Sequence, residues 1–377
     1  MRRTWIINGR FLTQPATGVQ RYGLEVVRAL DRHLAERHPL SRNLALELVA
    51  PHGTPSPSGL NVIAFRTAGR ASGHLWEQAE LPRLARAGGL LSLCNTGPLA
   101  LRKHIVCIHD ANTHTCPHSY TLAFRTLYRA LHPALGRTAA RITTVSRYSA
   151  RRLAQYGIGA RRSITLAPNG QEHALRWIPS HSAATRAVAG PNTVVLVGSA
   201  APHKNIGLIL AMADRLEQAG LDVAVTGLHD SRVLKGYQGR QPSFAGPVTW
   251  LGRVSDNELA ALLRDSLCLA FPSLEEGFGL PALEAMTLGC PVVVSNRASL
   301  PELCGDAALY ASPYDGEAWL DAFVSLRNNV ALREQLATRG RSRAQLYRWA
   351  RTAEIYLKEM ARIDGVPVLV DAAAVAA

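Results

Sequence analysis

The chain has 377 residues, of which 47% are hydrophobic and 19% are charged, and its formal net charge is +14. This length suffices for two domains of ordinary size, and the composition is that of a globular protein with a substantial core. No run approaches the ~20 apolar residues of a transmembrane helix, and the apolar run near the start is too short for a signal peptide.

The excess positive charge lies in the first half of the chain. Residues 1–170 hold 23 Lys or Arg against 7 Asp or Glu, whereas the remainder holds 19 against 21. Nearly all of these cations are arginines, which suit phosphate contacts. A basic half can bind nucleic acid, an anionic membrane surface or a diphosphate substrate. Aromatic stacking platforms do not accompany the arginine runs, so nucleic acid is not an expected partner.

The six cysteines show neither a Cys-x-x-Cys pair nor a zinc-binding spacing. Most of them lie in apolar runs, as buried free thiols do. This usage fits the reducing environment of a cytoplasm.

Alternating apolar runs and amphipathic stretches predict a first α/β domain over residues 1–170. Its first helix, over 18–30, carries apolar residues such as Val19, Tyr22 and Val26 on one face. The other helices are expected over 75–85, 120–135 and 146–156. Strands are expected over 5–8, 44–49, 61–65, 90–93, 104–108, 143–145 and 164–166.

A polar, proline-punctuated stretch over 171–191 predicts a linker into a second α/β domain, which we expect over 171–348. Ser255 and Glu258 have the spacing of a helix capping box. Residues 320–360 are expected to be helical, and the small, apolar residues 363–377 to form a disordered tail. Strands of the second domain are expected over 192–198, 221–225, 248–251, 267–271 and 291–295.

A glycine loop between a predicted strand and a predicted helix carries the main candidate site. Gly277, Phe278, Gly279 and Leu280 lead into a helix over 281–288, which Gly289 should end. Free N–H groups at such a helix start bind anions, and the carboxylates Glu276 and Glu284 on either side can accept hydrogen bonds from sugar hydroxyls. This chemistry suits a nucleotide sugar. Taken alone, two glutamates at this spacing are more often solvated surface residues.

The wider string EGFGLPALEAMTLGCPVVVSNRASLPELCGDAA, which starts at Glu276, closely resembles the donor-binding signature of the retaining glycosyltransferases of family 4. The E-x7-E pair of that family matches Glu276 and Glu284. The resemblance implies that Glu276 contacts the donor sugar and Glu284 the ribose. It also implies the GT-B fold, with two Rossmann-like domains facing each other across a donor-binding cleft. The helix over about 349–362 resembles the segment that returns to the first domain in such enzymes.

The same resemblance extends to residues outside this string. TGVQRY matches a first loop and helix in which Gly18 would lie against the donor diphosphate, and SAAPHKNIGLIL matches a phosphate site in which Lys204 would reach that diphosphate. His109 matches a histidine that faces the donor sugar, and we expect His109 and Glu276 to be the catalytic residues. Arg253 and Val254 match the loop that borders the nucleotide base. Ser199 and His203 depart from the pattern, since many members have arginine at one of them.

The resemblance implies retaining transfer of a hexose from a nucleotide sugar to a saccharide acceptor, without a metal or a cofactor. It favours mannose from GDP-mannose, with UDP-glucose as the alternative donor, in exopolysaccharide or O-antigen assembly. A catalytically inactive interaction subunit is the other reading, although the donor-site residues are retained.

The basic first domain favours an acceptor carried on a polyprenyl diphosphate. We therefore expect a cytoplasmic protein that can associate with the anionic inner face of the plasma membrane.

Overall fold

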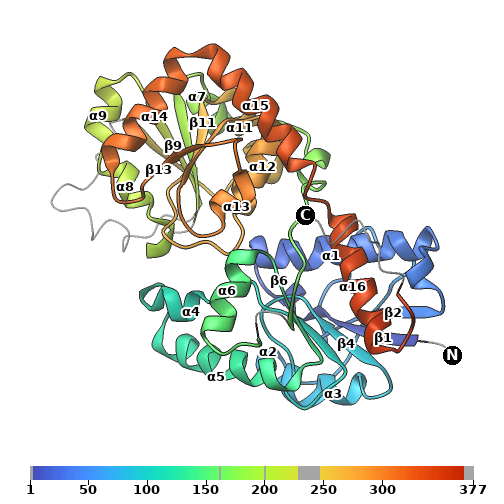
Figure 1. The fold of residues 1–377 in the computed structure, drawn as a ribbon. Coiled ribbons are helices and arrows are strands. Elements are labelled where there is room, and N and C mark those ends of the chain that lie inside the picture. The colour runs from blue at the N-terminus through green and yellow to red at the C-terminus, as the bar shows by residue number, and fades with distance from the viewer. Residues whose placement is uncertain (1–2, 161–162, 199–200, 228–246, 369–377) are drawn as a thin grey trace. The chain divides into compact units, whose positions relative to one another are not determined.

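The computed structural model describes residues 3–160, 163–198, 201–227 and 247–368. The chain divides into two compact units (Figure 1). Unit 1 comprises residues 1–111, 123–170 and 348–377, and unit 2 comprises residues 112–122 and 171–347. The expected boundaries at 170 and 348 lie at or next to these divisions, but residues 112–122 group with unit 2 although both of their neighbours in sequence group with unit 1.

Unit 1 contains a seven-stranded parallel sheet with the order β3-β2-β1-β4-β5-β6-β7. The order reverses direction between β1 and β4, which is the arrangement of a doubly wound sheet. The strands are β1 (Arg3–Asn8), β2 (Leu44–Ala50), β3 (Ala64–Thr67), β4 (Gly89–Ser92), β5 (His104–Cys107), β6 (Arg141–Thr144) and β7 (Ile164–Leu166).

Strand β3 begins three residues later than the sequence predicts. The buried carboxylate of Asp31 accepts hydrogen bonds from the backbone N–H groups of Asn61, Val62 and Ile63 at 2.7–2.9 Å. These donors are therefore used by a side chain on α1 rather than by a neighbouring strand, and pairing with β2 starts only at Ala64.

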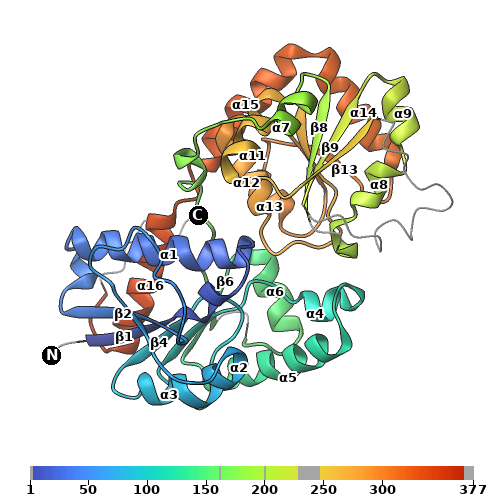
Figure 2. The same ribbon diagram turned by 180° about the vertical axis from the view of Figure 1, so that it is seen from behind.

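Helices cover both faces of the unit 1 sheet. On one face α1 (Gly18–Ala35) packs beside α16 (Trp349–Ile363), and α3 (Leu81–Leu84) and α5 (Leu122–Thr138) lie on the other (Figures 1 and 2). The remaining helices are η1 (Gly9–Thr13), η2 (Pro39–Ser41), α2 (Gly73–Leu75), η3 (Trp76–Glu80) and α6 (Arg147–Gln155).

Unit 2 contains a six-stranded parallel sheet with the order β10-β9-β8-β11-β12-β13. Its direction reverses between β8 and β11. The strands are β8 (Thr193–Val197), β9 (Asp222–Thr226), β10 (Val248–Gly252), β11 (Cys268–Phe271), β12 (Val292–Ser295) and β13 (Leu309–Ala311). Among the strands in the described part of unit 2, only the three-residue β13 was not predicted.

In unit 2, α8 (Ile206–Leu210), α9 (Ala213–Gln218) and α14 (Gly316–Asn328) lie on one face of the sheet, and α11 (Asp256–Asp265), α12 (Leu280–Leu288) and α15 (Val330–Ala344) on the other (Figure 2). The helix predicted over 320–360 is three helices, because Asn329 caps α15 and the chain leaves helical geometry again before α16. The short helices are α4 (Asn112–Thr115), η4 (Pro117–Ser119), η6 (Ala174–Arg176), α7 (Ala183–Val188), η7 (Pro202–Lys204) and α13 (Leu300–Cys304).

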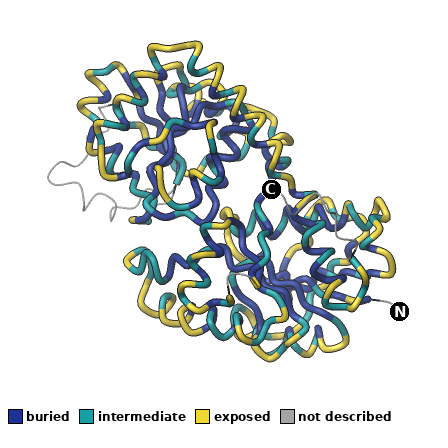
Figure 3. Tube along the Cα trace, in the orientation of Figure 1, coloured by how far each residue is buried: buried dark blue, intermediate teal, exposed yellow. Residues whose placement is uncertain are grey.

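Each unit has its own hydrophobic core, and the buried parts of the chain follow the strands (Figure 3). In unit 2, Trp319 and Phe323 of α14 pack against strand residues such as Val194. In unit 1, Leu131 and Leu135 of α5 pack near Val106. All six cysteines are free and four are buried, which confirms the prediction of buried thiols.

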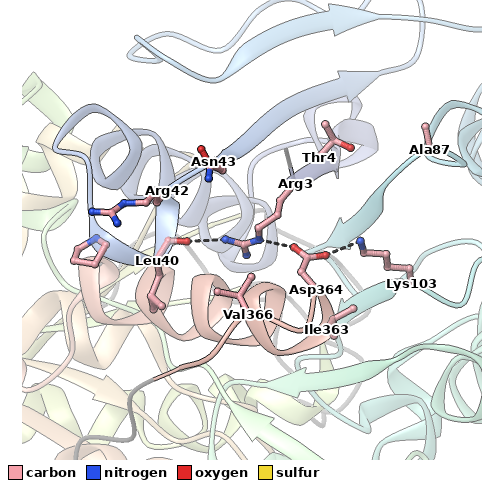
Figure 4. A pocket seen from close by; sticks show the side chains of 11 residues that line it. Arg3, Thr4, Leu40, Arg42, Asn43, Ala87, Lys103, Ile363, Asp364 and Val366 are labelled. Atoms are coloured by element: carbon pink, nitrogen blue, oxygen red, sulfur yellow. Dashed lines mark hydrogen bonds and ion pairs between the residues drawn. The ribbon is translucent and has the colours of Figure 1, made fainter. Parts of the chain in front are cut away.

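The last turn of α16 is tied to the amino-terminal edge of the unit 1 sheet. Asp364 accepts a hydrogen bond from Arg3 Nε at 2.7 Å, and its other oxygen pairs with Lys103 Nζ at 2.5 Å (Figure 4). It also accepts a hydrogen bond from Trp5 Nε1 at 2.9 Å. Arg3, Lys103 and Asp364 border a pocket of about 680 Å³. Residues 363–368 belong to the described part of the chain, and Asp364 is bound there by Arg3 and Lys103, so the tail predicted from 363 starts too early. Residues 369–377 lie outside the described part of the chain.

Replacing Asp364 with asparagine is expected to lower the free energy of unfolding by about 2–3 kcal/mol, because Arg3 would lose its carboxylate while its side chain is only 8% exposed. Burial raises the pKa of Asp364, but Lys103, Trp5 and Arg3 together hold it below its ordinary value. The ionised carboxylate therefore stabilises the fold above the unfolded pKa, and this contribution is lost as the pH falls through the lower folded pKa.

Thermal melting of both proteins between pH 7 and pH 3 tests this prediction. The gap between them should be full at pH 7 and shrink in acid. Asp321→Asn, which removes an exposed carboxylate from α14, is the matched control and should not change the melting temperature. A gap that stays constant down to pH 3 would contradict the role of the Asp364 charge.

Candidate functional site

The candidate site in unit 2 lies where the strand order reverses. Strands β8 and β11 are neighbours at this point, and both are parallel, so their carboxyl ends lie at the same edge of the sheet. Ligands of doubly wound sheets bind outside the carboxyl ends of strands at such a switch point. The chain leaves β8 toward Lys204 and leaves β11 toward Glu276, so the topology alone directs both predicted residues to one edge.

Lys204 and Glu276 form an ion pair at this edge. Lys204 Nζ donates to Glu276 Oε2 at 2.6 Å, and the two side chains are 21% and 14% exposed. The ammonium group also lies 5.4 Å from the ring centroid of Phe271, the last residue of β11. Ser299 Oγ donates to the backbone carbonyl of Glu276 at 2.9 Å, which fixes the loop. Lys204 and Glu276, which are 72 residues apart in the sequence, therefore lie in direct contact, and both side chains remain partly accessible to solvent.

The loop after Glu276 turns into α12 through Gly279. Its φ of +104° lies in the left-handed region, and a Cβ there would come within 2.8 Å of Leu300. Only glycine fits this position without strain. The helix starts at Leu280 and ends at the left-handed Gly289, which confirms the predicted start and stop signals. The side chains of Phe278 and Leu280 are buried, so the apolar residues of the loop pack into unit 2.

Glu284 lies in the second turn of α12 and is 5% exposed. Its Oε1 accepts a hydrogen bond from His173 Nε2 at 2.9 Å. His173 is itself buried and meets the Trp177 ring edge-on, with 5.5 Å between ring centroids. Glu284 is therefore not the solvated helix-surface residue of the alternative reading. It is a buried carboxylate near the amino end of a helix.

His203, the residue before Lys204, is uncharged. Burial and the neighbouring Lys204 ammonium lower the pKa of His203 to about 3. Its Nδ1 lies 2.9 Å from Ser119 Oγ, and its ring stacks on Tyr120. At this position, where many resembling proteins have arginine, the chain therefore supplies no second cation. Ser199, the other such position, lies outside the described residues.

Arg253 and Val254 follow β10, the edge strand two positions from β8. Arg253 is exposed and Val254 half-buried. With strands ~4.8 Å apart, this loop lies on the order of 10 Å from the end of β8. The capping box of Ser255 and Glu258, confirmed by both of its hydrogen bonds, starts α11 directly after it. The loop is thus on the same edge as Lys204 but apart from the ion pair.

In unit 1, His109 follows β5 at the carboxyl edge of the sheet, as predicted. It is 6% exposed, its Nε2 donates to the Leu93 carbonyl at 2.8 Å, and its backbone N–H donates to Asn95 Oδ1 at 2.7 Å. The ring meets Tyr22 edge-on, with centroids 4.7 Å apart. Burial lowers the pKa of His109, but the Cys107 thiol and the Leu93 carbonyl raise it above its ordinary value. The imidazole is held firmly within unit 1.

Gly18 is the first residue of α1 and is exposed. The loop that leads toward it is anchored by a buried polar cluster that sequence reasoning missed. Glu77 Oε1 accepts hydrogen bonds from Asn8 at 2.7 Å, from Arg10 at 3.1 Å and from Thr96 at 2.9 Å. Burial raises the pKa of Glu77, but His74, Arg10 and Asn8 hold it below its ordinary value. An ionised, fully buried carboxylate thus joins η3 to the carboxyl end of β1.

Two further findings concern absences within the described residues. There, no group of three or more His, Cys, Asp and Glu side chains is arranged to hold a metal ion. In the same part of the chain, no helix combines the length and apolar character needed to cross a bilayer.

Comparison with known proteins identifies a domain within unit 2 and similar proteins over most of the chain. Residues 178–343 match the model of the glycosyl transferases group 1. The chain is 27% identical over 376 aligned positions to the O-antigen chain mannosyltransferase B of Escherichia coli, covering 89% of this chain and 93% of that protein. Residues 178–343 of unit 2 are a glycosyl transferases group 1 domain. The transferase is also 37% identical to the MMP alpha-(1->4)-mannosyltransferase of Mycolicibacterium hassiacum, over 29% of each chain.

Solved structures of similar fold show that the transferase has the GT-B fold. The sucrose-phosphate synthase of Thermosynechococcus elongatus matches with a TM-score of 0.68 and 18% identity, over 97% of this chain and all of that one. WaaG, a glycosyltransferase involved in lipopolysaccharide biosynthesis, matches with a TM-score of 0.66 and 16% identity, over 96% of the transferase and all of WaaG. The expected fold and the expected hexosyltransferase class are therefore confirmed.

Proposed function

We propose that the chain transfers a hexose, with retention of anomeric configuration, from a nucleotide sugar to a lipid-linked saccharide acceptor. GDP-mannose is the donor that we favour, because two similar proteins are named O-antigen chain mannosyltransferases and another a serotype-specific mannosyltransferase. The donor would lie against Lys204, Glu276, the backbone of residues 277–280 and Glu284, with Gly18 near the diphosphate and with Arg253 and Val254 near the base.

The Lys204–Glu276 pair is the observation that carries this proposal. In a nucleotide sugar the diphosphate is bonded directly to the hexose. Its binding site therefore needs a cation for the phosphate next to a group that accepts hydrogen bonds from the sugar hydroxyls. An ammonium and a carboxylate 2.6 Å apart at a switch point provide both. The buried Glu284, near the start of the next helix, supplies a second carboxylate for the ribose hydroxyls.

The reaction breaks the bond between the anomeric carbon and the β-phosphate oxygen and forms a bond to the acceptor oxygen on the same face of the sugar. The acceptor proton passes to the departing phosphate oxygen. Lys204 stabilises the charge that develops on that phosphate. Glu276 binds sugar hydroxyls and orients the ring. The two glutamates are thus not the acid and nucleophile of a hydrolase.

Thermal-shift measurements with GDP, UDP, ADP and CMP test the donor class and the base together. A nucleotide at 100 times its Kd should stabilise the binding state by about 2.7 kcal/mol. Transfer from labelled GDP-mannose and UDP-glucose to an undecaprenyl-diphosphate-linked saccharide then identifies the sugar. If none of these nucleotides raises the melting temperature, the proposed function is wrong.

Transfer is expected to need no divalent metal ion, because the Lys204 ammonium can take the charge of the leaving diphosphate. Initial rates with and without a large excess of EDTA should agree within about twofold if no bound metal ion takes part in catalysis. Rates that fall to background in EDTA and return with magnesium would contradict the proposed role of Lys204.

A membrane surface is the proposed setting for the acceptor. Residues 111–171 contain nine arginines and no Asp or Glu. Within this segment, α5 exposes Leu122 by 68% and Leu127 by 45%, together with the exposed Arg129 and Arg137. A helix that carries exposed apolar side chains and cations suits the interface of an anionic bilayer.

The full-length protein should therefore co-sediment with vesicles containing phosphatidylglycerol but not with pure phosphatidylcholine vesicles. Arg129→Glu combined with Arg137→Glu should weaken this binding by at least about 30-fold, since each of the two cations near the surface contributes ~1 kcal/mol and the new carboxylates are repelled by the anionic lipid. Arg186→Glu on α7, an exposed site in unit 2, is the matched control. Equal binding to both vesicle types, or an equal loss in the control, would show that α5 is not the contact.

A further inference from the structure

His173 lies outside every motif by which the sequence predicts the donor site. It follows the junction at residue 170 between the units and immediately precedes η6. Its side chain is 1% exposed, and its Nε2 lies 2.9 Å from Oε1 of Glu284, which is 111 residues later in the chain. Since an ionised carboxylate only accepts hydrogen bonds, Nε2 carries the proton and donates it. This interaction therefore fixes the tautomer of the ring as well as its partner.

The segment around His173 is itself well anchored. The backbone N–H of Gln171 donates to the carbonyl of Tyr347 at 3.1 Å, and Arg176 N–H donates to the carbonyl of His173 at 3.1 Å. The Trp177 ring lies edge-on to the imidazole. The backbone hydrogen bonds and the Trp177 ring thus fix the position of the imidazole. A fixed imidazole can in turn hold the Glu284 carboxylate in one orientation.

A carboxylate on a glutamate side chain rotates easily about its last torsion, because sp³–sp² torsions are broad. Binding a cis-diol requires both carboxylate oxygens at defined positions. A buried N–H donor on one oxygen restricts this rotation before the ligand arrives, which lowers the entropy cost of binding. The α12 helix fixes the backbone of Glu284 but not the torsion of its carboxylate. His173 is a buried N–H donor that contacts one oxygen of this carboxylate.

We propose that His173 is a positioning residue for the donor nucleotide, acting through Glu284 on recognition of the ribose hydroxyls. The inference rests on the proposed function of Glu284 as the ribose ligand. It extends the donor site to a histidine for which neither the glycine loop nor the E-x7-E pair gives a signal.

The experiment compares GDP with 2′,3′-dideoxy-GDP by titration calorimetry on the full-length protein. The wild type should bind GDP about tenfold more tightly, as expected for hydrogen bonds to a charged group. Glu284→Ala should abolish this preference. His173→Ala should reduce it to about twofold or less, with GDP binding weakened by about fivefold and dideoxy-GDP affinity little changed. His173→Gln, whose amide N–H can replace Nε2–H, should retain most of it.

The outcomes separate the possible failures. If His173→Ala lowers the melting temperature but leaves the preference for GDP intact, His173 only stabilises the fold and the inference is wrong. If the wild type has no preference, or if Glu284→Ala leaves it unchanged, Glu284 does not bind the ribose and the proposed role of Glu284 fails first. If His173→Gln behaves as His173→Ala, a donated hydrogen bond is not what matters, which also overturns the inference.

Discussion

Replacing Lys204 with alanine is expected to lower kcat/KM by about 10³-fold, because the ammonium group stabilises charge on the leaving diphosphate. Most of the loss should appear in kcat, since the negative charge on the bridging oxygen develops as the bond breaks and the contact strengthens in the transition state. Initial rates of hexose transfer, measured with the donor that the nucleotide screen selects, check this prediction.

The ion pair provides the control. Lys204→Ala leaves Glu276, whose side chain is only 14% exposed, without its cation. Part of any activity loss could then reflect a distorted loop rather than a missing phosphate ligand. Lys204→Ala combined with Glu276→Gln removes the unpaired charge and should restore the melting temperature without restoring kcat. Recovery of activity in the double variant would contradict the phosphate role of Lys204.

The parts of unit 2 that the sequence predicted well depend on local backbone chemistry. Pro281 and Gly289 bracket α12, and the structure has this helix from Leu280 to Leu288. Ser255 and Glu258 form the expected capping box. In each case the residues that decide the structure lie within one or two helical turns of each other, so a pattern in the sequence suffices. The Asn329 cap that breaks the predicted long helix is also local, and an N-cap reading could have found it.

Contacts between distant residues could not be predicted in this way. The pairing of Lys204 with Glu276 spans 72 residues, and that of His173 with Glu284 spans 111. The residues around His173 in the sequence do not indicate that its partner is Glu284, because the two side chains come into contact only in the folded chain. Asp364 illustrates the same point, since small apolar neighbours suggested a disordered tail while Arg3 and Lys103, hundreds of residues earlier, bind its carboxylate.

Replacing His109 with alanine is expected to lower kcat by about 10²-fold with little change in donor affinity, if the imidazole acts on the hexose as the anomeric carbon gains positive charge. The structure adds a second expected effect. A ring that is 6% exposed, packs edge-on against Tyr22 and donates to the Leu93 carbonyl contributes to stability. Its removal creates a cavity and leaves a buried acceptor unsatisfied, so the melting temperature should also fall.

His109→Gln distinguishes these two effects, because its amide nitrogen can reach the position of Nε2 and keep the hydrogen bond to Leu93. We expect this variant to melt close to the wild type while kcat stays about 10²-fold low. Single-turnover rates and calorimetric melting of the same preparations measure both quantities. Restoration of kcat together with melting would mean that the imidazole only holds the end of β5 against Leu93. A normal kcat in His109→Ala would exclude the imidazole from the reaction altogether, because removal of a group that stabilises the transition state cannot leave the chemical step unchanged when that step limits the rate.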